Sequence, residues 1–155
     1  MSTIFSIDPG KNGAVVFWSN GEMISINNLA YEGTKISLQW LKEIFENCKP
    51  KTLVIENVHT SPRMGVVSAG NFMYNLGAIH SAATMAGTEI VMLTPQKWKA
   101  VVGLYGKHKG AALIKARELF PSDWLSKIEN RKNSIDRAEA ALIGVAYAKI
   151  QEYKK

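Results

Sequence analysis

The sequence lacks the marks of several protein classes. It contains one cysteine, Cys48, which excludes an internal disulfide and an all-cysteine metal site and is typical of a reducing cytosol. No apolar run approaches the roughly 20 residues of a membrane-spanning helix. The N-terminus has no basic segment followed by an apolar core and a small-residue cleavage site, so no secretory signal is predicted. These absences predict a cytoplasmic protein without a membrane partner.

Acidic residues are too few to balance the basic residues in the last part of the chain. Residues 96–155 contain 13 lysines and arginines against 6 aspartates and glutamates, whereas residues 1–95 contain 6 against 7. The net charge of +6 therefore comes from the C-terminal part. A basic segment of this kind predicts a polyanionic partner, most simply nucleic acid, although a solvated basic surface has the same composition.

The remaining composition is that of an ordinary soluble domain. The chain has 155 residues, of which 46% are hydrophobic and 21% charged. This length is enough for one domain with a core and too short for two ordinary ones. The sequence contains no internal repeat and no linker. We therefore predict a single domain over residues 1–155.

Apolar runs bounded by turn residues predict five strands. The first three lie at about 4–8, 13–18 and 22–29. They are joined by a turn at 10–13 and by Asn20-Gly21, which is a strong hairpin signal, and they predict an antiparallel meander. Two further strands are predicted at about 53–58 and 89–93.

Helices are predicted around and after the later strands. Thr34 is a good N-cap for a helix to about residue 47, and a long helix is expected over about 67–86. The long helix is rich in small residues, which indicates either packing against the sheet or a dimer contact. A short helix from Pro95, a helix ending near residues 119–121 and a last helix from about 133 to 151 complete the prediction.

Isolated acids stand where ligands are often bound. Asp8 and Glu56 end two predicted strands, and ligands tend to bind at the carboxyl ends of strands in sheets covered by helices. Asp136 and Glu139 are three residues apart on one face of the last helix, where like charges repel unless a cation lies between them. The alternatives are that Asp8 caps its own turn, that Glu56 pairs with a lysine and that the helix acids are ordinary first-turn acids.

Four carboxylates from two strands and one helix would suit a hard divalent cation. Mg²⁺ and Mn²⁺ prefer oxygen ligands, and Mg²⁺ keeps several waters that a substrate phosphate can displace. Two such ions can activate water and stabilise the leaving oxygen in phosphodiester cleavage. Together with the basic C-terminal part, Asp8, Glu56, Asp136 and Glu139 therefore favour a metal-dependent nuclease.

Basic and aromatic residues supply candidate contacts to nucleic acid. Lys107 and Lys109 lie between glycines just before a predicted helix, which predicts either a phosphate-binding loop or a solvated one. Aromatic residues after the broken segment 59–65 could stack on bases or pack in the core. The candidate contacts are Lys11, His59, Arg63, Met64, Phe72, Tyr74, Lys97, Lys99, His108, Arg131 and Lys132.

These motifs, taken in order, resemble those of a known family. They are Ile7-Asp8-Pro9-Gly10, Val54-Ile55-Glu56, the pair Lys107 and Lys109, and Asp136-Arg137-Ala138-Glu139-Ala140. The ordered set spans nearly the whole chain and resembles the RuvC-type Holliday-junction resolvases, in their small phage-like branch, within the ribonuclease H-like superfamily. The sequence departs from the family pattern in having Glu139 where an aspartate is usual, His59 in place of an aromatic residue, and a longer loop at 59–71.

The resemblance implies both a fold and an activity. The fold would be an α/β ribonuclease H-like fold: a mixed five-stranded sheet, with three antiparallel strands followed by two parallel strands, flanked by helices. The activity would be that of a homodimer, joined through the helix at about 67–86, which resolves four-way junctions by symmetric paired nicks and leaves 5′-phosphates. If the chain is phage-encoded, it would work in the host cytoplasm.

The resemblance also assigns roles to the candidate residues. Asp8, Glu56, Asp136 and Glu139 would hold two Mg²⁺ ions, for which Mn²⁺ could substitute, and Lys107 or Lys109 would contact the scissile phosphate. The alternatives are a broader nuclease for branched DNA or RNA–DNA hybrids and a junction-binding module that does not cut. An actin-like phosphate-binding domain also opens with a strand, an acid and a hairpin, but it needs a second lobe for which this chain is too short.

Overall fold

A central five-stranded sheet organises the molecule. A computed structural model describes residues 2–129 and 133–155. The strand order in the sheet is β3-β2-β1-β6-β7, in which β3, β2 and β1 are antiparallel and β6 and β7 continue parallel to β1. The strands are β1 (Thr3–Asp8), β2 (Ala14–Ser19), β3 (Glu22–Asn28), β6 (Thr52–Glu56) and β7 (Glu89–Leu93). The predicted mixed sheet is confirmed.

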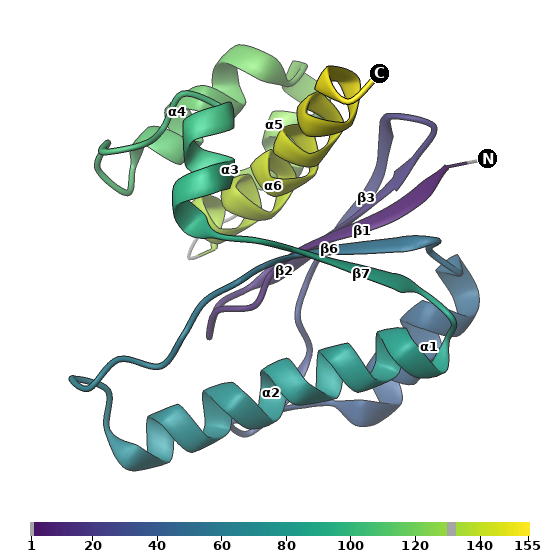
Figure 1. Cartoon of the computed structure of the whole chain (residues 1–155), viewed down its shortest axis with the longest axis vertical. Helices are drawn as coiled ribbons and strands as arrows, with labels where there is room; N and C mark the ends of the chain where they lie inside the picture. Colours follow the sequence, from purple (N-terminus) through teal and green to yellow (C-terminus); the bar gives the residue numbers. More distant parts are fainter. Residues whose placement is uncertain (1, 130–132) are drawn as a thin grey trace.

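Helices cover both faces of this sheet (Figure 1). One face is covered by α1 (Leu38–Cys48) and α2 (Val66–Met85). The other face is covered by α3 (Pro95–Val101), α4 (Ala111–Leu119), α5 (Ser122–Ile128) and α6 (Ser134–Tyr153). Within the described residues, none of the helices has the length and apolar character needed to cross a membrane.

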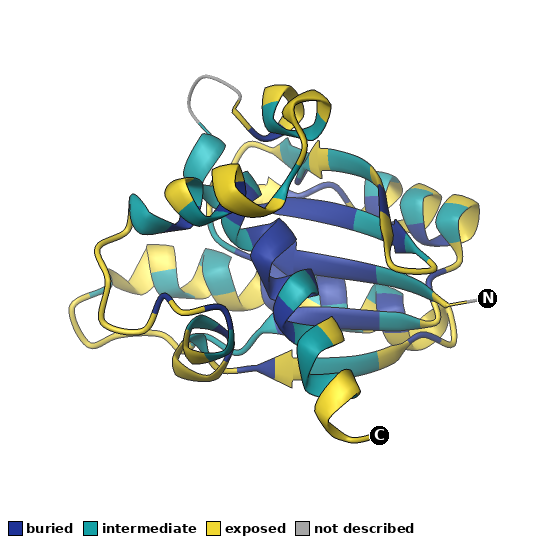
Figure 2. Ribbon diagram, turned by 90° about the horizontal axis from the view of Figure 1, so that it is seen from above, coloured by how far each residue is buried: buried dark blue, intermediate teal, exposed yellow. Residues whose placement is uncertain are grey.

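Strand alternation divides the core into two parts. Successive side chains of a strand point to opposite faces, so Phe5 and Ile7 pack with α1 and α2, whereas Ser6 contacts α6. On β6, Leu53 and Ile55 likewise face α1 and α2. The central strands β2, β1 and β6 are largely buried between these two helical layers, whereas the edge strands β3 and β7 are mostly exposed or half-buried (Figure 2). The same alternation places the last residue of β1 and of β6 on the α6 side.

Helix α6 lies directly on β1 and β2. The Ser6 hydroxyl donates to the Ala140 carbonyl at 2.7 Å, and the Trp18 indole N–H donates to Ser6 Oγ at 2.8 Å. A Cβ atom on Gly144 would come within 2.5 Å of the Trp18 ring nitrogen. Glycine therefore lets the helix backbone approach the indole closely, and this contact fixes the distance of α6 from the sheet.

The segment before α1 differs from the prediction. Thr34 is not an N-cap, because residues 31–36 form a small hairpin of β4 (Tyr31–Glu32) and β5 (Lys35–Ile36). Helix α1 is capped instead by Ser37, whose hydroxyl accepts a hydrogen bond from the Trp40 N–H at 3.2 Å. The pattern missed this hairpin because each of its strands is only two residues long.

Two further features differ from the sequence prediction. Helix α5 was not predicted, since its seven residues follow Pro121 in a segment without clear helical periodicity. The segment 59–71 is not one long loop, because α2 already begins at Val66. The other helices and the five main strands lie close to their predicted positions.

Candidate active site

Asp8 ends β1 on a tight turn and is buried. Its Oδ1 accepts a hydrogen bond from the Gly10 N–H at 3.0 Å, and the turn is closed by a 2.8 Å bond from the Gly13 N–H to the Gly10 carbonyl. Gly13 has no room for a side chain, because a Cβ there would lie 2.0 Å from the Asp8 carbonyl oxygen. The predicted turn cap is thus confirmed for Oδ1, while Oδ2 is buried and accepts no hydrogen bond from the described residues.

Three of the four predicted acids meet at this point. Asp8, Asp136 and Glu139 each offer a carboxylate oxygen, and these oxygens lie within 4.8 Å of one another. Asp136 is in the first turn of α6, where the N-terminal end of the helix dipole favours an anion. Arg137 fixes that turn, since its Nε donates to Asn28 Oδ1 at 2.7 Å on β3.

Glu56 lies beside this group and is held by a different helix. Its Oε2 accepts a hydrogen bond from the Trp98 indole N–H of α3 at 2.9 Å. Burial raises the pKa of Glu56, and the charge of Asp8 raises it further. The indole N–H, Lys99 and Lys109 act in the opposite direction. Glu56 is therefore close enough to the three acids to be affected by their charge, although it is outside the 4.8 Å group.

The pKa values of the three acids are raised, so a nearby positive charge would stabilise their ionised forms. Burial raises the pKa of Asp8, and Asp136 adds to this rise. Burial raises the pKa of Glu139 to about 8, with further contributions from the charge of Asp8, the hydrogen bond with Asp8 and the charge of Glu56. Near neutral pH, Glu139 thus keeps its proton. A divalent cation can replace this proton, and carboxylate oxygens are the ligands that Mg²⁺ and Mn²⁺ prefer.

The charges of two lysines oppose the raised pKa values of the acids. Burial raises the pKa of Asp136, and the charge of Lys109 opposes this rise. Burial also raises the pKa values of Asp8 and Glu56, and the charge of Lys109 opposes both of these rises. Lys99 opposes the raised pKa of Glu56 and Glu139. Lys109 therefore acts on three of the four acids, which sequence spacing could not distinguish from the neighbouring Lys107.

A polar hollow opens beside Glu139. It has a volume of about 330 Å³ and lies under the segment that joins α3 to α4. This hollow brings together several predicted basic residues and one predicted acid. Its lining consists of Trp98, Lys99, Leu104, Lys107, His108, Lys109, Ala112 and Glu139. A phosphate group in the hollow would be close to both the lysines and the acids.

Tyr31 is a site residue that the sequence did not indicate. Its hydroxyl donates to the Gly10 carbonyl at 2.9 Å, so it fastens the turn that holds Asp8. Burial raises the pKa of Tyr31 to about 12, and the charges of Asp8 and Asp136 add to the rise. The phenol therefore stays protonated and keeps its donor role. Its position depends on the β4–β5 hairpin, which left no usable pattern in the sequence.

The remaining predicted contacts lie in different places. Lys11 is exposed in the turn after Asp8, and Lys97 is exposed on α3. In the segment between β6 and α2, His59 and Arg63 are exposed and Met64 is half-buried. Arg131 and Lys132 lie outside the described residues. None of these positions by itself tests a contact with DNA.

The two predicted stacking aromatics are on the opposite face of the sheet from α6. Phe72 packs against the core formed by α1, α2 and the sheet, as the core alternative predicted. Tyr74 is 42% exposed, and the Lys35 ammonium group lies 4.9 Å from its ring centroid.

Solved structures with a similar fold were found by comparison of the coordinates. RuvC of Thermus thermophilus, in complex with Holliday junction substrate, has a TM-score of 0.69 at 15% identity, with 97% of this chain and 96% of that chain covered. This chain has the RuvC-type resolvase fold. The yeast mitochondrial Holliday junction resolvase Ydc2 has a TM-score of 0.64 at 17% identity, covering 98% of this chain and 83% of that chain.

A viral structure extends the similarity. The fowlpox virus Holliday junction resolvase has a TM-score of 0.62 at 18% identity, with 96% of this chain and 99% of that chain covered. No protein-family model matches the sequence, and no curated protein is similar to it in sequence. The RuvC-type fold is thus established over nearly the full chain by structure, at identities too low for sequence comparison alone.

Proposed function

We propose that this protein is a metal-dependent endonuclease that resolves four-way DNA junctions by symmetric paired nicks and leaves 5′-phosphates. The observation that carries this proposal is the group formed by Asp8, Asp136 and Glu139. In a RuvC-type fold, this group combines a buried carboxylate oxygen without a donor and an adjoining hollow lined by lysines. These features fit a site for cations and a phosphodiester.

The four acids would share the binding of two Mg²⁺ ions, for which Mn²⁺ could substitute. When bound, such ions neutralise charge that develops on the phosphate and activate water for hydrolysis. The Pro9-Gly10 turn and Tyr31 keep the Asp8 carboxylate in place, and α6 presents Asp136 and Glu139 together. Since Oδ1 of Asp8 is occupied by the Gly10 N–H, Oδ2 is the oxygen available to a metal.

Lysines near the acids would bind the DNA backbone. Lys109 already acts on the charges of Asp8, Glu56 and Asp136, so it is the best placed to meet the scissile phosphate. Lys107, His108 and Lys99 of α3 line the same hollow. Contacts of this kind are independent of base sequence and weaken as salt concentration rises.

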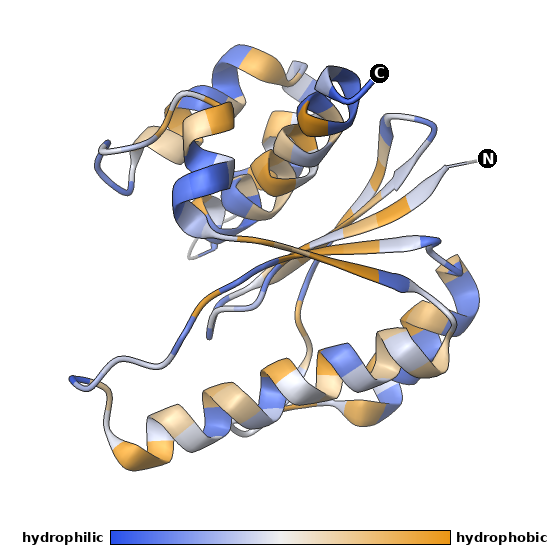
Figure 3. Ribbon diagram, in the orientation of Figure 1, coloured by the Kyte–Doolittle hydropathy of each residue, from blue (hydrophilic) through white to orange (hydrophobic). Residues whose placement is uncertain are grey.

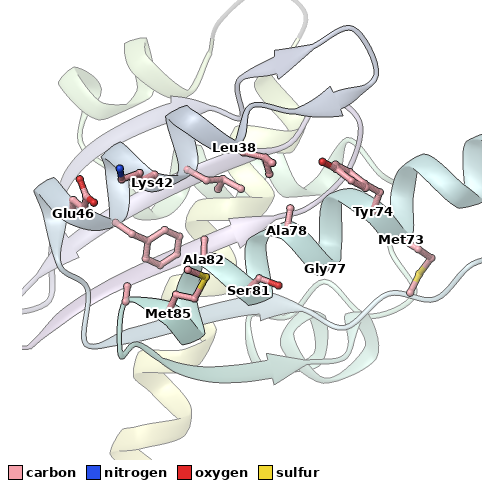
Figure 4. A pocket seen from close by; sticks show the side chains of 13 residues that line it. Leu38, Lys42, Glu46, Met73, Tyr74, Gly77, Ala78, Ser81, Ala82 and Met85 are labelled. Carbon is pink, nitrogen blue, oxygen red and sulfur yellow. The ribbon is translucent and has the colours of Figure 1, made fainter.

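Symmetric cleavage requires two copies of the site, and α2 offers the surface for a homodimer. An apolar groove of about 730 Å³ runs between α1 and α2 (Figure 4). Met85 on this groove is 88% exposed, and Val66 and Val67 at the start of α2 are 90% and 77% exposed. Figure 3 shows hydrophobic residues at the first turn and along much of α2. Such a surface is typical of a protein–protein contact.

The proposal is tested with a labelled four-way junction in Mg²⁺ or Mn²⁺. We expect paired nicks by the parent and a loss of about a hundredfold or more in Asp8→Asn and Glu56→Gln, because each removes a charge that the transition state needs. Asp123→Asn, on an exposed acid of α5, is the matched control and should cut like the parent. Cleavage by Asp8→Asn at the parental rate would refute the assigned site.

Other substrates separate this proposal from its alternatives. Equal cleavage of flaps, forks or RNA–DNA hybrids would favour a broader nuclease of the ribonuclease H-like superfamily. Tight, salt-sensitive binding of junctions without any metal-dependent product would favour a binding module. We place the activity in the cytoplasm, where the single thiol of Cys48 would remain reduced.

A further inference from the structure

Trp98 occupies an unusual position for a core residue. Helix α3 begins immediately after β7, where the Thr94 hydroxyl accepts a hydrogen bond from the Lys97 N–H at 3.2 Å and Pro95 is the first helical residue. This start places Trp98 one turn into α3 and completely out of solvent. The side chain packs in the core shared with α6. The position of Trp98 is therefore fixed by the β7–α3 junction and by packing against α6.

The indole ring does more than fill space. A buried indole N–H needs an acceptor, and here the acceptor is the carboxylate of Glu56 at 2.9 Å rather than a backbone carbonyl. Glu56 lies opposite Leu93 in the β6–β7 pairing. Leu93 is only a few residues before Trp98 along the chain, which brings the indole close to Glu56. The Lys99 ammonium group lies 5.5 Å from the centroid of the Trp98 ring. A phenylalanine could fill most of this volume but could not donate to Glu56.

We infer that Trp98 is a positioning residue for Glu56, holding Oε2 through its indole N–H so that Oε1 is the oxygen presented for metal binding. This inference rests on the proposed function, since it assigns a role toward the metal that Glu56 would hold. Glu56 is outside the 4.8 Å group of Asp8, Asp136 and Glu139, and its Oε2 is held by Trp98. Outer hydrogen-bond partners of this kind orient a ligating carboxylate and tune its affinity.

Metal binding by the free protein tests this role without DNA. Mn²⁺ binding is measured by calorimetry on the parent, Trp98→Phe and Trp40→Phe. Trp40→Phe is the matched control, because it changes a partly buried indole on α1, which packs on the face of the sheet opposite to α6. We expect Trp98→Phe to bind Mn²⁺ about 10- to 100-fold more weakly, and Trp40→Phe to bind like the parent. Thermal unfolding of both variants shows that each is folded.

The NMR signal of the indole N–H gives a second test, which does not require Trp98 to be replaced. The chain has four tryptophans, so its ¹H–¹⁵N spectrum has four indole signals. We expect one signal to move in Glu56→Gln and the same signal to move when Mg²⁺ is added to the parent. In Trp98→Phe this signal should disappear, which assigns it.

The outcomes separate this inference from the proposed function. A parent that binds no Mn²⁺ would overturn the proposed function and this inference with it. A parent that binds Mn²⁺, together with a folded Trp98→Phe that binds it equally well, would overturn this inference alone. Indole signals that respond neither to Glu56→Gln nor to Mg²⁺ would also overturn it, even if Trp98→Phe failed to fold.

Discussion

Glu139→Gln should make the metal-free protein more stable at alkaline pH. In the parent, burial and the charge of Asp8 raise the pKa of Glu139 from its ordinary value of 4.5 to about 8. Ionised Glu139 is therefore less favourable in the folded protein than in the unfolded chain. Glutamine keeps the shape of the side chain and carries no charge at any pH, so it removes this cost.

The size and pH range of the effect follow from these values. A difference of one unit between the folded and unfolded pKa corresponds to about 1.4 kcal/mol. Full ionisation of Glu139 would therefore lower the free energy of unfolding by a few kcal/mol. Water reaches part of the site and screens the charges, and we expect about 1–3 kcal/mol. Below the ordinary pKa both forms carry a proton and the variant has no advantage. The parent then loses stability as pH rises from 4.5 towards about 8.

Thermal unfolding in EDTA at pH 4 and pH 8.5 measures this difference. For a chain of 155 residues, the expected gain corresponds to about 3–10 °C in Tm at pH 8.5 and to almost none at pH 4. Addition of Mg²⁺ should reverse the order, because a ligand that binds only the folded state adds about 2.7 kcal/mol at a hundredfold excess over its Kd. Without one of its carboxylates, the variant should gain less.

A control on the same helix separates this effect from general charge. Glu152→Gln removes an exposed carboxylate near the end of α6 and should melt like the parent at both pH values, in EDTA and in Mg²⁺. The reasoning is refuted if Glu139→Gln melts below the parent at pH 8.5 without metal. It is refuted equally if the variant and the parent gain the same stability from Mg²⁺.

Three further predictions concern the DNA contact, the dimer and the core. Lys109→Ala should weaken junction binding and reduce the slope of log K against log salt by about 1, since one phosphate contact is lost, whereas Lys51→Ala, on an exposed lysine directly before β6, should leave that slope unchanged. Met85→Glu, on a residue that is 88% exposed in the α1–α2 groove, should leave the Tm near that of the parent but convert the dimer to monomer in light scattering, and an unchanged mass would contradict the α2 interface. Gly144→Ala should lower the free energy of unfolding by about 1–3 kcal/mol in urea, because its Cβ would lie 2.5 Å from the Trp18 ring nitrogen, and a stability equal to that of the parent would contradict the close approach of α6.

Much of the site could be predicted because strand and helix periodicity is local. Alternation along β1 and β6 sends Ser6 and Asp8 to one face of the sheet, and the three-residue spacing of Asp136 and Glu139 gives them one face of α6. These relations hold wherever the elements are placed. The residue pattern thus predicted which acids could share a site, and the family resemblance implied the mixed sheet.

Contacts between separate elements could not be predicted in this way. The hydrogen bond from Trp98 to Glu56 depends on how α3 leaves β7 and packs against α6. Tyr31 reaches Gly10 because a hairpin of two-residue strands turns it back towards β1. No period along the chain encodes either distance, because the two partners come from segments that are brought together only by packing.

The same division applies to the charges. The sequence determined that four acids and an excess of lysines are present, whereas only the tertiary structure decided which of them interact. Burial next to Asp8 is what raises the pKa of Glu139 to about 8, and proximity in the fold is what makes Lys109 act on three acids. Desolvation and charge interactions depend on distance in space, so they are properties of the packed protein and not of its sequence pattern.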